Sequence, residues 1–346
     1  MGLTIHTLKL DLGMKLMTEL SLIDRFDASW ATIEKREAAS LKQLKSIATV
    51  RSVGASTRIE GSKMTDDEVA VLIENLSISR LEERDAQEVM GYFEALDTII
   101  DNFELIRISE GSIKNLHKVL MQHGEKDDWH RGNYKQVSNA VEASLGDGTK
   151  QLVFRTAEPG IETQDAMHRL LEWYEADQDT IPIVKVALFV YEFLSIHPFQ
   201  DGNGRLSRLL GTLLMLKSGY SWIQYVSFEH EIESRKSEYY KVLMQTQRNR
   251  PGENATDWLA FFMSCLVNIQ GQLMKKLDES KTVQPTSARE KRIIVFIQNH
   301  PGCSSGEIAK KLDLVLVTVK KSLSTLANKG LIIREGQGKS TGYFLA

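Results

Sequence analysis

The chain has 346 residues, of which 42% are hydrophobic and 26% are charged, and its formal net charge is −3 at pH 7. It is long enough for two or three domains with substantial cores. Its two cysteines, Cys265 and Cys303, have no metal-binding or redox spacing, and nothing calls for disulfide bonds. No signal sequence, apolar run of eighteen residues, internal repeat or low-complexity tract is present. We therefore expect a protein of the reducing cytoplasm that does not enter a membrane.

Residues 1–110 show helical periodicity with charge-rich faces and predict an N-terminal helical region. A helix at about 45–61 would place Ser56 and Glu60, which are four residues apart, on one face. Gly61 is a natural terminator just past that helix. Taken alone, these three positions fit an exposed glutamate at a helix end equally well.

Two short segments in the middle of the chain favour β-structure in an otherwise helical sequence. Residues 133–141 and 151–156 flank a Gly/Asp-containing turn at 145–149. This pattern predicts a hairpin over about 133–157. Its edge strand would hold an extended peptide by main-chain hydrogen bonds. A hairpin that only decorates the surface would have the same pattern.

The segment 197–208 reads His-Pro-Phe-Gln-Asp-Gly-Asn-Gly-Arg-Leu-Ser-Arg. Apolar residues at helical spacing precede it from Ile183 to Leu194 and follow it from Leu206 to Leu216, so a loop should join two buried helices. Glycines in such a loop let backbone N–H groups approach a phosphate. The helix that follows begins with unpaired donors and a positive dipole end. The segment therefore predicts a polyphosphate site.

The polar side chains of this loop suit phosphoryl chemistry. Arg205 and Arg208 are three residues apart, share one helix face and can reach the same anion. Asp201 offers a hard oxygen ligand for Mg²⁺. His197, since the ordinary pKa of histidine is about 6.5, suits removal of a proton from a hydroxyl at neutral pH. The sequence thus predicts transfer of a phosphorus-containing group from a nucleotide to a hydroxyl.

Two simpler interpretations of this loop fit less well. A calcium loop of the EF-hand type needs an oxygen ligand and then a glycine where this chain has Arg205 and Leu206. An ordinary Asn-Gly turn between two core helices would have no need of the histidine, the aspartate and both arginines.

The segment resembles the signature of the Fic family: histidine, any residue, phenylalanine, any residue, an acid, Gly-Asn-Gly-Arg, two residues, arginine. Every specified position is matched, and the resemblance covers roughly residues 40–275. It implies a mainly α-helical enzyme, a Fic-type bundle with a small β-hairpin flap, that moves AMP from ATP to a side-chain hydroxyl of a target protein. The implied roles are the base for His197, the Mg²⁺ ligand for Asp201, and ATP binding for Gly202, Asn203, Gly204, Arg205 and Arg208, with Phe199 as a core anchor.

One signature position separates two chemistries within the family. Doc-type relatives that act as kinases carry lysine where this chain has Gly204, and glycine there goes with AMP transfer. Upstream, Ser56, Glu60 and Gly61 resemble the family's inhibitory motif. By this resemblance Glu60 pairs with Arg208 and occupies the place of the γ-phosphate, so the enzyme would inhibit itself.

Two further resemblances extend the expected site. Residues 129–134 resemble the lead-in to the family's flap, which clamps a target segment, although Lys135 stands where relatives often have arginine. Tyr239, Tyr240 and Gln247 resemble the adenine pocket, with glutamine in place of the asparagine common in relatives. Packing of either tyrosine in the core is the alternative.

The C-terminal residues differ from the rest in charge. After a catalytic domain at 111–275 and a linker at 276–288, residues 289–346 resemble a winged helix-turn-helix domain. Residues 287–346 contain ten Lys and Arg and four Asp and Glu, a net charge of +6. DNA contact and protein contact both remain open for this domain, and the residues expected to be exposed on its third helix are Thr318, Lys320, Lys321 and Ser324.

Two other functions stay open besides AMP transfer. The protein would be a transcription regulator if the nucleotide site only sensed ATP, and it would remove AMP from modified targets if Glu60 oriented a water. The target protein, its modified residue and the oligomeric state, including a homodimer, do not follow from the sequence.

Overall fold

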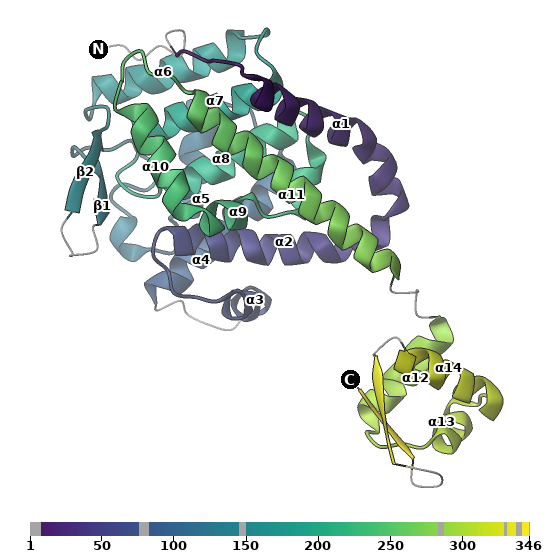
Figure 1. The fold of residues 1–346 in the computed structure, drawn as a ribbon. Helices are drawn as coiled ribbons and strands as arrows, with labels where there is room; N and C mark the ends of the chain where they lie inside the picture. Colours follow the sequence, from purple (N-terminus) through teal and green to yellow (C-terminus); the bar gives the residue numbers. More distant parts are fainter. Residues whose placement is uncertain are drawn as a thin grey trace. The chain divides into compact units, whose positions relative to one another are not determined.

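The computed structural model describes residues 8–75, 83–144, 150–282, 287–328, 331–336 and 341–345 (Figure 1). The chain divides into two compact units with a boundary between Leu273 and Met274. No helix in these described ranges combines the length and apolar character that a membrane crossing requires.

The first unit is mainly α-helical, as the sequence predicts. Its N-terminal helices are α1 (Met14–Arg36), α2 (Ala38–Ile59), α3 (Asp66–Glu74) and α4 (Arg84–Asn102). The helices that follow are α5 (Glu110–Leu120), α6 (Ile161–Ala176), α7 (Pro182–Ile196), α8 (Asn203–Lys217), α9 (Phe228–Ser234), α10 (Lys236–Gln247) and α11 (Thr256–Thr282), with short 3₁₀ helices η2 (Glu125–Asp127) and η3 (Ser221–Tyr225).

Helices α7 and α8 form the centre of this unit. Every residue of 186–196 in α7 and of 205–216 in α8 is buried. A helix that is covered on all sides must be apolar around its whole circumference, which explains the dense run of Val, Leu, Phe and Ile in both segments. The two helices pack against each other. The loop that joins them, 197–202, is therefore held between two rigid elements.

The N-terminal helices and the expected catalytic domain share one core. Val53, Ala55 and Ile59 of α2 are buried, and α2 packs against α4, α9 and η3. The boundary expected near residue 110 is therefore not a boundary between two compact units. This packing brings the end of α2 close to α8, far along the chain.

The expected linker at 276–288 begins later than predicted, because α11 continues to Thr282. Residues 276–282 contain no glycine or proline that would end a helix. Leu273 and Leu277, four residues apart, are both fully buried. The apolar stripe thus continues past the point where polar composition favoured a loop.

The predicted hairpin is present, but its first strand is misplaced. Strands β1 (Ala140–Ser144) and β2 (Lys150–Arg155) pair antiparallel, from Ala140 opposite Arg155 to Ser144 opposite Lys150. Residues 133–139, expected to be strand, instead run along the signature loop, where Tyr134 bridges Phe199 and the Lys135 N–H donates to the Pro198 carbonyl. The predicted turn at 145–149 lies outside the described residues.

The second unit has the helices and the two-stranded wing predicted for a winged helix. Helices α12 (Ala288–Asn299), α13 (Ser305–Leu312) and α14 (Leu316–Asn328) precede the antiparallel strands β3 (Ile332–Glu335) and β4 (Gly342–Leu345). Capping boxes begin α12 at Ser287 and α13 at Ser304. Its separate core consists of Ile293, Ile297, Cys303, Ile308, Val319, Leu323, Leu326 and Ile332.

Two helical glycines allow a test of the packing in the first unit. A Cβ added at Gly91 of α4 would overlap the backbone carbonyl oxygen of Leu120 in α5, whereas one at Gly271 of α11 would meet no atom within 4 Å. We expect Gly91→Ala to lower the free energy of unfolding by about 3 kcal/mol, because a backbone atom cannot move aside cheaply. We expect Gly271→Ala to raise it by about 0.5–1 kcal/mol through better helix propensity. Urea unfolding followed by circular dichroism measures both. If Gly91→Ala and Gly271→Ala unfolded at the same urea concentration, this result would contradict the close crossing of α4 and α5.

Candidate active site

The loop between α7 and α8 has a sharply turned backbone. His197 caps the end of α7 in the left-handed conformation (φ 53°), and Gly202 before α8 is also left-handed (φ 78°). A non-glycine residue in this conformation costs about 1–3 kcal/mol and is common at functional sites. The buried Asn203 side chain holds the loop, since its Oδ1 accepts from the Phe199 N–H at 2.9 Å and its Nδ2 donates to the Phe199 carbonyl at 2.8 Å.

The His197 ring is in the form that a proton acceptor requires. Burial, and then the nearby Lys135 ammonium, lower the pKa of His197 to about 4. The imidazole is therefore neutral at pH 7. Its Nδ1 lies 3.4 Å from the Leu194 carbonyl, which can only accept, so Nδ1 carries the proton. Nε2 keeps a lone pair with which it can accept a proton.

Lys135, which stands where relatives often have arginine, is buried at the base of the hairpin. Its side chain is buried, and Nζ donates to Asn139 Oδ1 and Thr156 Oγ1, each at 2.8 Å, and to the Ile196 carbonyl at 3.3 Å. Burial lowers the pKa of Lys135 to about 8. This ammonium fastens the base of the hairpin to the residue before His197.

Asp201 belongs to a ring of alternating charges. Its Oδ1 accepts from the Gly202 N–H at 2.6 Å, and its Oδ2 lies 3.5 Å from Arg84 Nη2 and from Arg205 Nη2. Glu88 closes the ring, at 2.8 Å from Arg84 and 3.4 Å from Arg205. Although burial opposes ionisation, Arg205, the Gly202 N–H and Arg84 hold the pKa of Asp201 below its ordinary value.

Arg205 has the unmet hydrogen-bonding capacity that an anion would satisfy. Its side chain is 2% exposed, and neither Nε nor Nη1 has a hydrogen-bond partner within the described chain. Buried donors of this kind are costly unless a ligand accepts from them. They lie in the first turn of α8, beside the glycine turn 202–204, so the residues present fit a phosphate group.

The donor set also fits Mg²⁺. No cluster of three or more His, Cys, Asp or Glu side chains able to hold a metal occurs in the part of the chain described. Asp201 would therefore supply the protein carboxylate, and substrate phosphates and water would supply the other oxygens. This arrangement is usual for Mg²⁺ but not for Zn²⁺ or Ca²⁺ sites.

Arg208, the second signature arginine, is already paired. Its Nε donates to Ser56 Oγ at 2.8 Å, and its Nη2 donates to the Ser56 carbonyl at 2.9 Å and to Glu60 Oε1 at 2.7 Å. Burial disfavours the charged guanidinium, but Glu60 raises the pKa of Arg208 above its ordinary value. A Cβ added at Gly204 would overlap Glu60 Oε1, so this carboxylate lies over the glycine turn.

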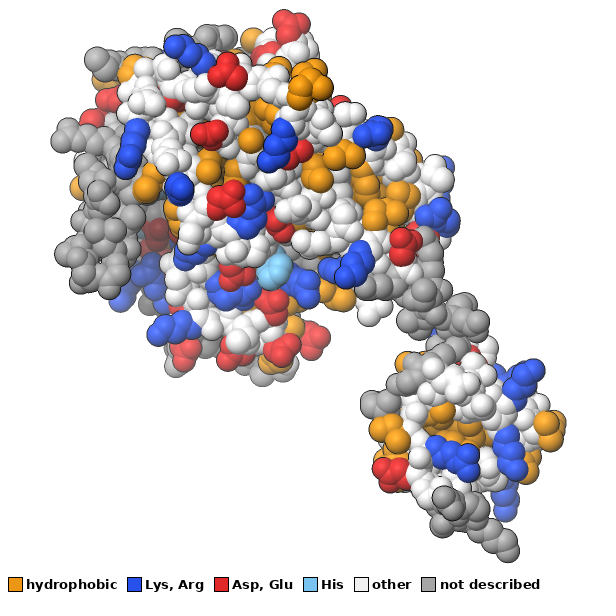
Figure 2. Space-filling model, in the orientation of Figure 1, with side chains coloured by type: hydrophobic (Ala, Val, Ile, Leu, Met, Phe, Trp, Pro, Cys, Tyr) orange, Lys and Arg blue, Asp and Glu red, His pale blue; other side chains and the backbone are white. Residues whose placement is uncertain are grey.

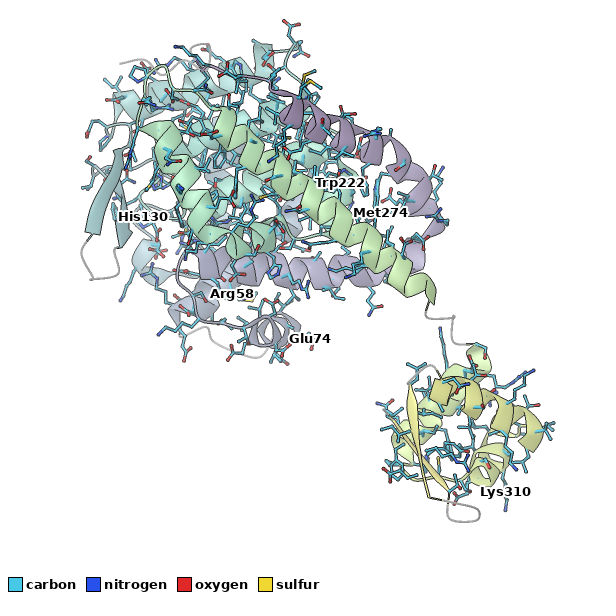
Figure 3. The ribbon with its side chains drawn as sticks, viewed as in Figure 1. Arg58, Glu74, His130, Trp222, Met274 and Lys310 are labelled. Atoms are coloured by element: carbon cyan, nitrogen blue, oxygen red, sulfur yellow. The ribbon has the colours of Figure 1, made fainter. Side chains whose placement is uncertain are left out.

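Helix α2 ends in a way that directs Glu60 to this position. Gly61 (φ 113°) turns the chain, and the Ser62 N–H returns to the Thr57 carbonyl. Arg58, labelled at this helix end in Figure 3, makes a bidentate pair with Glu233 of α9, at 2.6 and 3.0 Å. It also donates to the Met64 carbonyl at 2.9 Å. The last turn of α2 is therefore fixed to the catalytic core.

The residues expected to bind adenine lie deeper than a stacking pocket would require. Tyr239 is buried, packs against Trp258 and Phe261, and burial raises its pKa to about 12. Tyr240 is half-buried. Gln247 is also buried, and its Nε2 donates to Ser195 Oγ at 2.8 Å, while its Oε1 has no hydrogen-bond partner among the described residues. Tyr239 thus packs in the core, and a role for Tyr239, Tyr240 and Gln247 in adenine binding stays a prediction.

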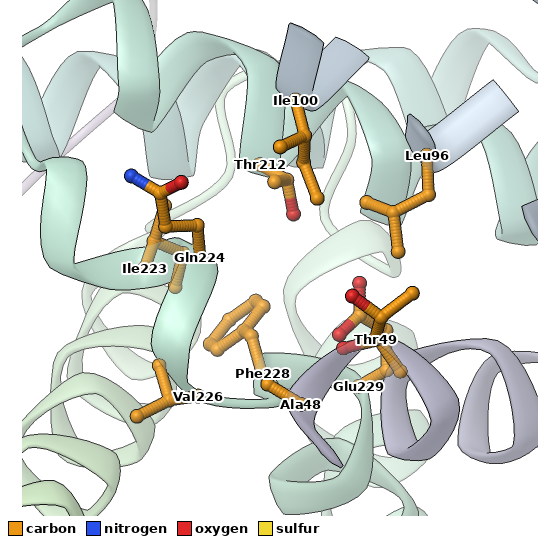
Figure 4. Close-up of a pocket in the computed structure, with 11 residues that line it drawn as sticks. Ala48, Thr49, Leu96, Ile100, Thr212, Ile223, Gln224, Val226, Phe228 and Glu229 are labelled. Carbon is orange, nitrogen blue, oxygen red and sulfur yellow. The ribbon is translucent and has the colours of Figure 1, made fainter. Parts of the chain in front are cut away.

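A small cavity elsewhere in this unit is not a nucleotide site. It lies between α2, α4, α8 and α9 and is lined by apolar residues together with Thr49, Ser52, Thr212, Gln224 and Glu229 (Figure 4). Its volume is about 10 Å³, which is room for one water. Glu229, which accepts from the Tyr92 hydroxyl at 2.9 Å, gives such a water a polar partner.

Sequence analysis missed four residues of the site. Arg84, Glu88 and Glu233 reach it from helices far along the chain. His117 of α5 is fully buried, and its Nε2 lies 3.0 Å from the Asp201 carbonyl. No motif or spacing in the sequence connects these residues with the signature, so no sequence signal could have found them.

Comparison with known proteins agrees with this geometry. Residues 107–215 match the model of the Fic/DOC family, and residues 287–333 match a model described as winged helix-turn-helix DNA-binding. The fold resembles the crystal structure of a Fic family protein from Desulfovibrio desulfuricans, with a TM-score of 0.73, 23% identity and coverage of 98% of both chains. A Fic domain protein from Bacteroides thetaiotaomicron gives a TM-score of 0.58, with 23% identity over 75% of this chain and 97% of that one.

Curated sequences give a consistent result. The protein adenylyltransferase Fic of Drosophila grimshawi is 28% identical over 207 residues, which are 58% of this chain and 39% of that protein. The Culex quinquefasciatus protein is 25% identical over 53% of this chain and 35% of its own length. The chain thus spans about two fifths or less of these relatives. The fold and the signature loop define a Fic-type helical domain joined to a winged helix. Residues 107–215 are thus similar to the Fic/DOC family, and the fold is shared with a Fic family protein.

The electrostatic effect of Lys135 on His197 predicts a measurable shift in the pKa of the histidine. Replacing Lys135 with Met removes a positive charge near the imidazole, so protonation becomes easier and the pKa of His197 should rise above about 4. Lys135→Arg keeps the charge and should leave the pKa close to its original value. Nuclear magnetic resonance titration of the His197 ring measures both. An unchanged pKa in Lys135→Met would show that burial alone neutralises the histidine.

Proposed function

We propose that the protein is a self-inhibited adenylyltransferase that moves AMP from ATP to a Ser, Thr or Tyr hydroxyl of a target protein or of itself. The observation that carries this proposal is the glycine turn at α8, which lies beside a neutral His197 and between two buried arginines. In one of these, Arg205, neither Nε nor Nη1 has a hydrogen-bond partner among the described residues, although Nη1 lies 3.4 Å from Glu88; the other, Arg208, is paired with Glu60. Curated relatives named protein adenylyltransferase support the same activity.

The chemical steps of AMP transfer would use His197 at the start of the loop and the glycine turn with Arg205 at its end. Nε2 of His197 would take the proton of the incoming hydroxyl as its oxygen attacks the α-phosphorus of ATP. The bond from the α-phosphorus to the bridging oxygen breaks, and pyrophosphate leaves. The backbone N–H groups at 202–204 and the free donors of Arg205 would stabilise the phosphate oxygens as charge develops. The imidazolium then loses its proton to solvent.

Mg²⁺, when bound, would neutralise charge on the phosphates that leave. Asp201 would hold it, and the other residues of the charge ring would keep Asp201 ionised and oriented. The hairpin β1–β2 would hold a stretch of target protein by strand addition, with its base fixed beside His197 through Lys135. Such binding uses main-chain hydrogen bonds, so it selects the target sequence weakly.

Self-inhibition follows from the position of Glu60. Its carboxylate occupies Arg208 and covers Gly204, where the terminal phosphate of ATP would otherwise meet this arginine. The Glu60 side chain is 31% exposed, whereas the Arg208 side chain is 2% exposed. Glu60 is therefore the partner that can leave. A phosphate that replaced it would satisfy the same buried guanidinium.

Removing Glu60 should activate the enzyme. We expect Glu60→Gly, incubated with ATP and Mg²⁺, to gain one or more AMP adducts, at a rate at least tenfold above that of the unchanged protein, since about 1.4 kcal/mol of blocked binding corresponds to tenfold. Intact-mass spectrometry detects the adduct. His197→Ala in the same background should abolish it, because no group remains to accept the hydroxyl proton.

A matched control is Glu74→Gly, which removes a glutamate from the exposed end of the neighbouring helix α3 (Figure 3). It should label no faster than the unchanged protein. Binding of ATP by Glu60→Gly without any adduct, together with ATP-dependent binding of DNA, would favour an ATP-sensing regulator instead. Loss of AMP from a premodified target would favour the reverse reaction.

For the second unit, we propose contact with duplex DNA. Lys310, Lys311, Lys320 and Lys321 are exposed on α13 and α14, and Thr318 and Ser324 lie on the same helix as the last two. Figure 2 shows Lys and Arg side chains predominating over acidic ones on the visible face of this domain. Helix α14 occupies the position of the recognition helix in such modules.

This second proposal predicts a salt-dependent interaction. The double variant Lys320→Glu, Lys321→Glu should weaken binding of a duplex and lower the slope of log affinity against log salt by about two, if each lysine meets one phosphate. Fluorescence anisotropy over a range of salt concentrations measures it. The control variant Lys35→Glu, Lys42→Glu changes the net charge equally, at exposed positions of α1 and α2. If both double variants weakened duplex binding equally, non-specific attraction to the net charge would explain the binding and the proposal for α14 would fail.

A further inference from the structure

We propose that His117, a residue of α5 outside the signature, is a positioning residue that sets the turn at Asp201 and thereby the affinity for Mg²⁺-bound ATP. This inference rests on the proposed function, because it assigns a supporting residue to the same site. His117 would touch neither the nucleotide nor the target hydroxyl. It would act through the backbone of the residue that holds the metal.

The contacts of His117 connect two loops, the signature loop at Asp201 and the loop at Gly132 before the hairpin. Nε2 lies 3.0 Å from the Asp201 carbonyl oxygen, and Nδ1 lies 2.9 Å from the backbone nitrogen of Gly132, which precedes the hairpin. The ring stacks on Phe199 with centroids 3.9 Å apart and planes within 9°. One side chain thus makes a polar contact with each loop and an aromatic contact with the signature.

These contacts require one form of the imidazole. A carbonyl oxygen can only accept and a backbone N–H can only donate, so Nε2 must carry the proton and Nδ1 must not. A protonated ring would place a proton against the Gly132 N–H. The two contacts therefore fit the neutral ring with its proton on Nε2. Both ring nitrogens are engaged, and neither is left for acid–base catalysis.

The carbonyl that His117 holds belongs to the residue whose side chain would bind Mg²⁺. Directly after it, Gly202 is left-handed, and a Cβ there would lie 3.5 Å from His117 Nε2 and 3.1 Å from Met121 Sδ. The turn is therefore packed against α5 with little spare room. Loss of the bond from Nε2 would leave a buried carbonyl without a partner, which costs about 1–3 kcal/mol, and the turn would shift to satisfy it.

Two substitutions of similar size separate the two polar contacts. Gln has its amide at about the distance of Nε2, so His117→Gln can still donate to the Asp201 carbonyl. Asn has its amide at the distance of Nδ1, so His117→Asn can accept from Gly132 but cannot reach Asp201. Both lose the stacking on Phe199. Each variant keeps one polar contact and loses the other, so weaker binding by His117→Asn than by His117→Gln shows that the contact with Asp201 matters more than the contact with Gly132.

The experiment uses the full chain carrying Glu60→Gly, and it measures the affinity for ATP with Mg²⁺ by isothermal titration calorimetry. We expect about a tenfold weaker affinity for His117→Asn, and a change of less than about threefold for His117→Gln, with similar melting temperatures. With EDTA in place of Mg²⁺, the difference between the two variants should narrow, because Asp201 then has no metal to position.

Equal affinities in the two variants would overturn the inference alone, provided that the parent binds ATP. A parent that binds no ATP would overturn the proposed function and the inference together. A second measurement does not depend on whether the variants fold: one-bond ¹⁵N–¹H coupling in the parent shows which ring nitrogen of His117 carries the proton. A proton on Nδ1 would overturn the inference.

Discussion

The structure depends above all on the pairing of the buried Arg208 guanidinium. A cation that is 2% exposed needs partners, and the end of α2 supplies the hydroxyl and carbonyl of Ser56 and the carboxylate of Glu60. Breaking such a pair without replacement costs about 3–5 kcal/mol, because the charge stays buried. Ser56 lies within α2 and is fully buried, whereas the Glu60 side chain is 31% exposed. An anion of similar charge is then the natural replacement for Glu60.

The position of the Glu60 side chain is set by residues that do not contact the signature segment 197–208. The left-handed Gly61 ends α2 directly after the glutamate, so its side chain leaves the last turn of the helix. Arg58, two residues earlier, holds that turn to Glu233 of α9 and to Asp66 of α3. Because Arg58 binds two carboxylates and a carbonyl, the helix end has one preferred position. Any partner that competed for Glu233 or Asp66 would loosen the hold on Glu60 without entering the site.

Sequence reasoning succeeded where the chemistry is local. The segment 197–208 is continuous, and its glycines, acid and arginines follow one another in one turn between two helices, so their grouping needs no knowledge of the fold. Glu60 could be placed only because its motif was recognised, and the pair it forms spans 148 positions. The contact of His117 with Asp201 spans 84 positions and that of Arg58 with Glu233 spans 175. Such contacts follow from helix packing, and a single sequence has no periodicity that encodes them. The burial of Tyr239 could not be predicted for the same reason, since the sequence pattern of an aromatic residue is the same in a pocket and in a core.

Gly204 connects the chemistry of the site with its regulation. A side chain there would overlap Glu60 Oε1, and Arg208 Nη1 would lie only 3.4 Å from its Cβ. The Glu60 carboxylate occupies the space beside Gly204 in this structure. Phosphate oxygens would occupy the same space in the proposed reaction. Under the proposed function, the steric requirement for glycine at position 204 would serve both the transfer of AMP and the inhibition by Glu60. A substitution at residue 204 would disturb both at once, whereas one at residue 60 separates them.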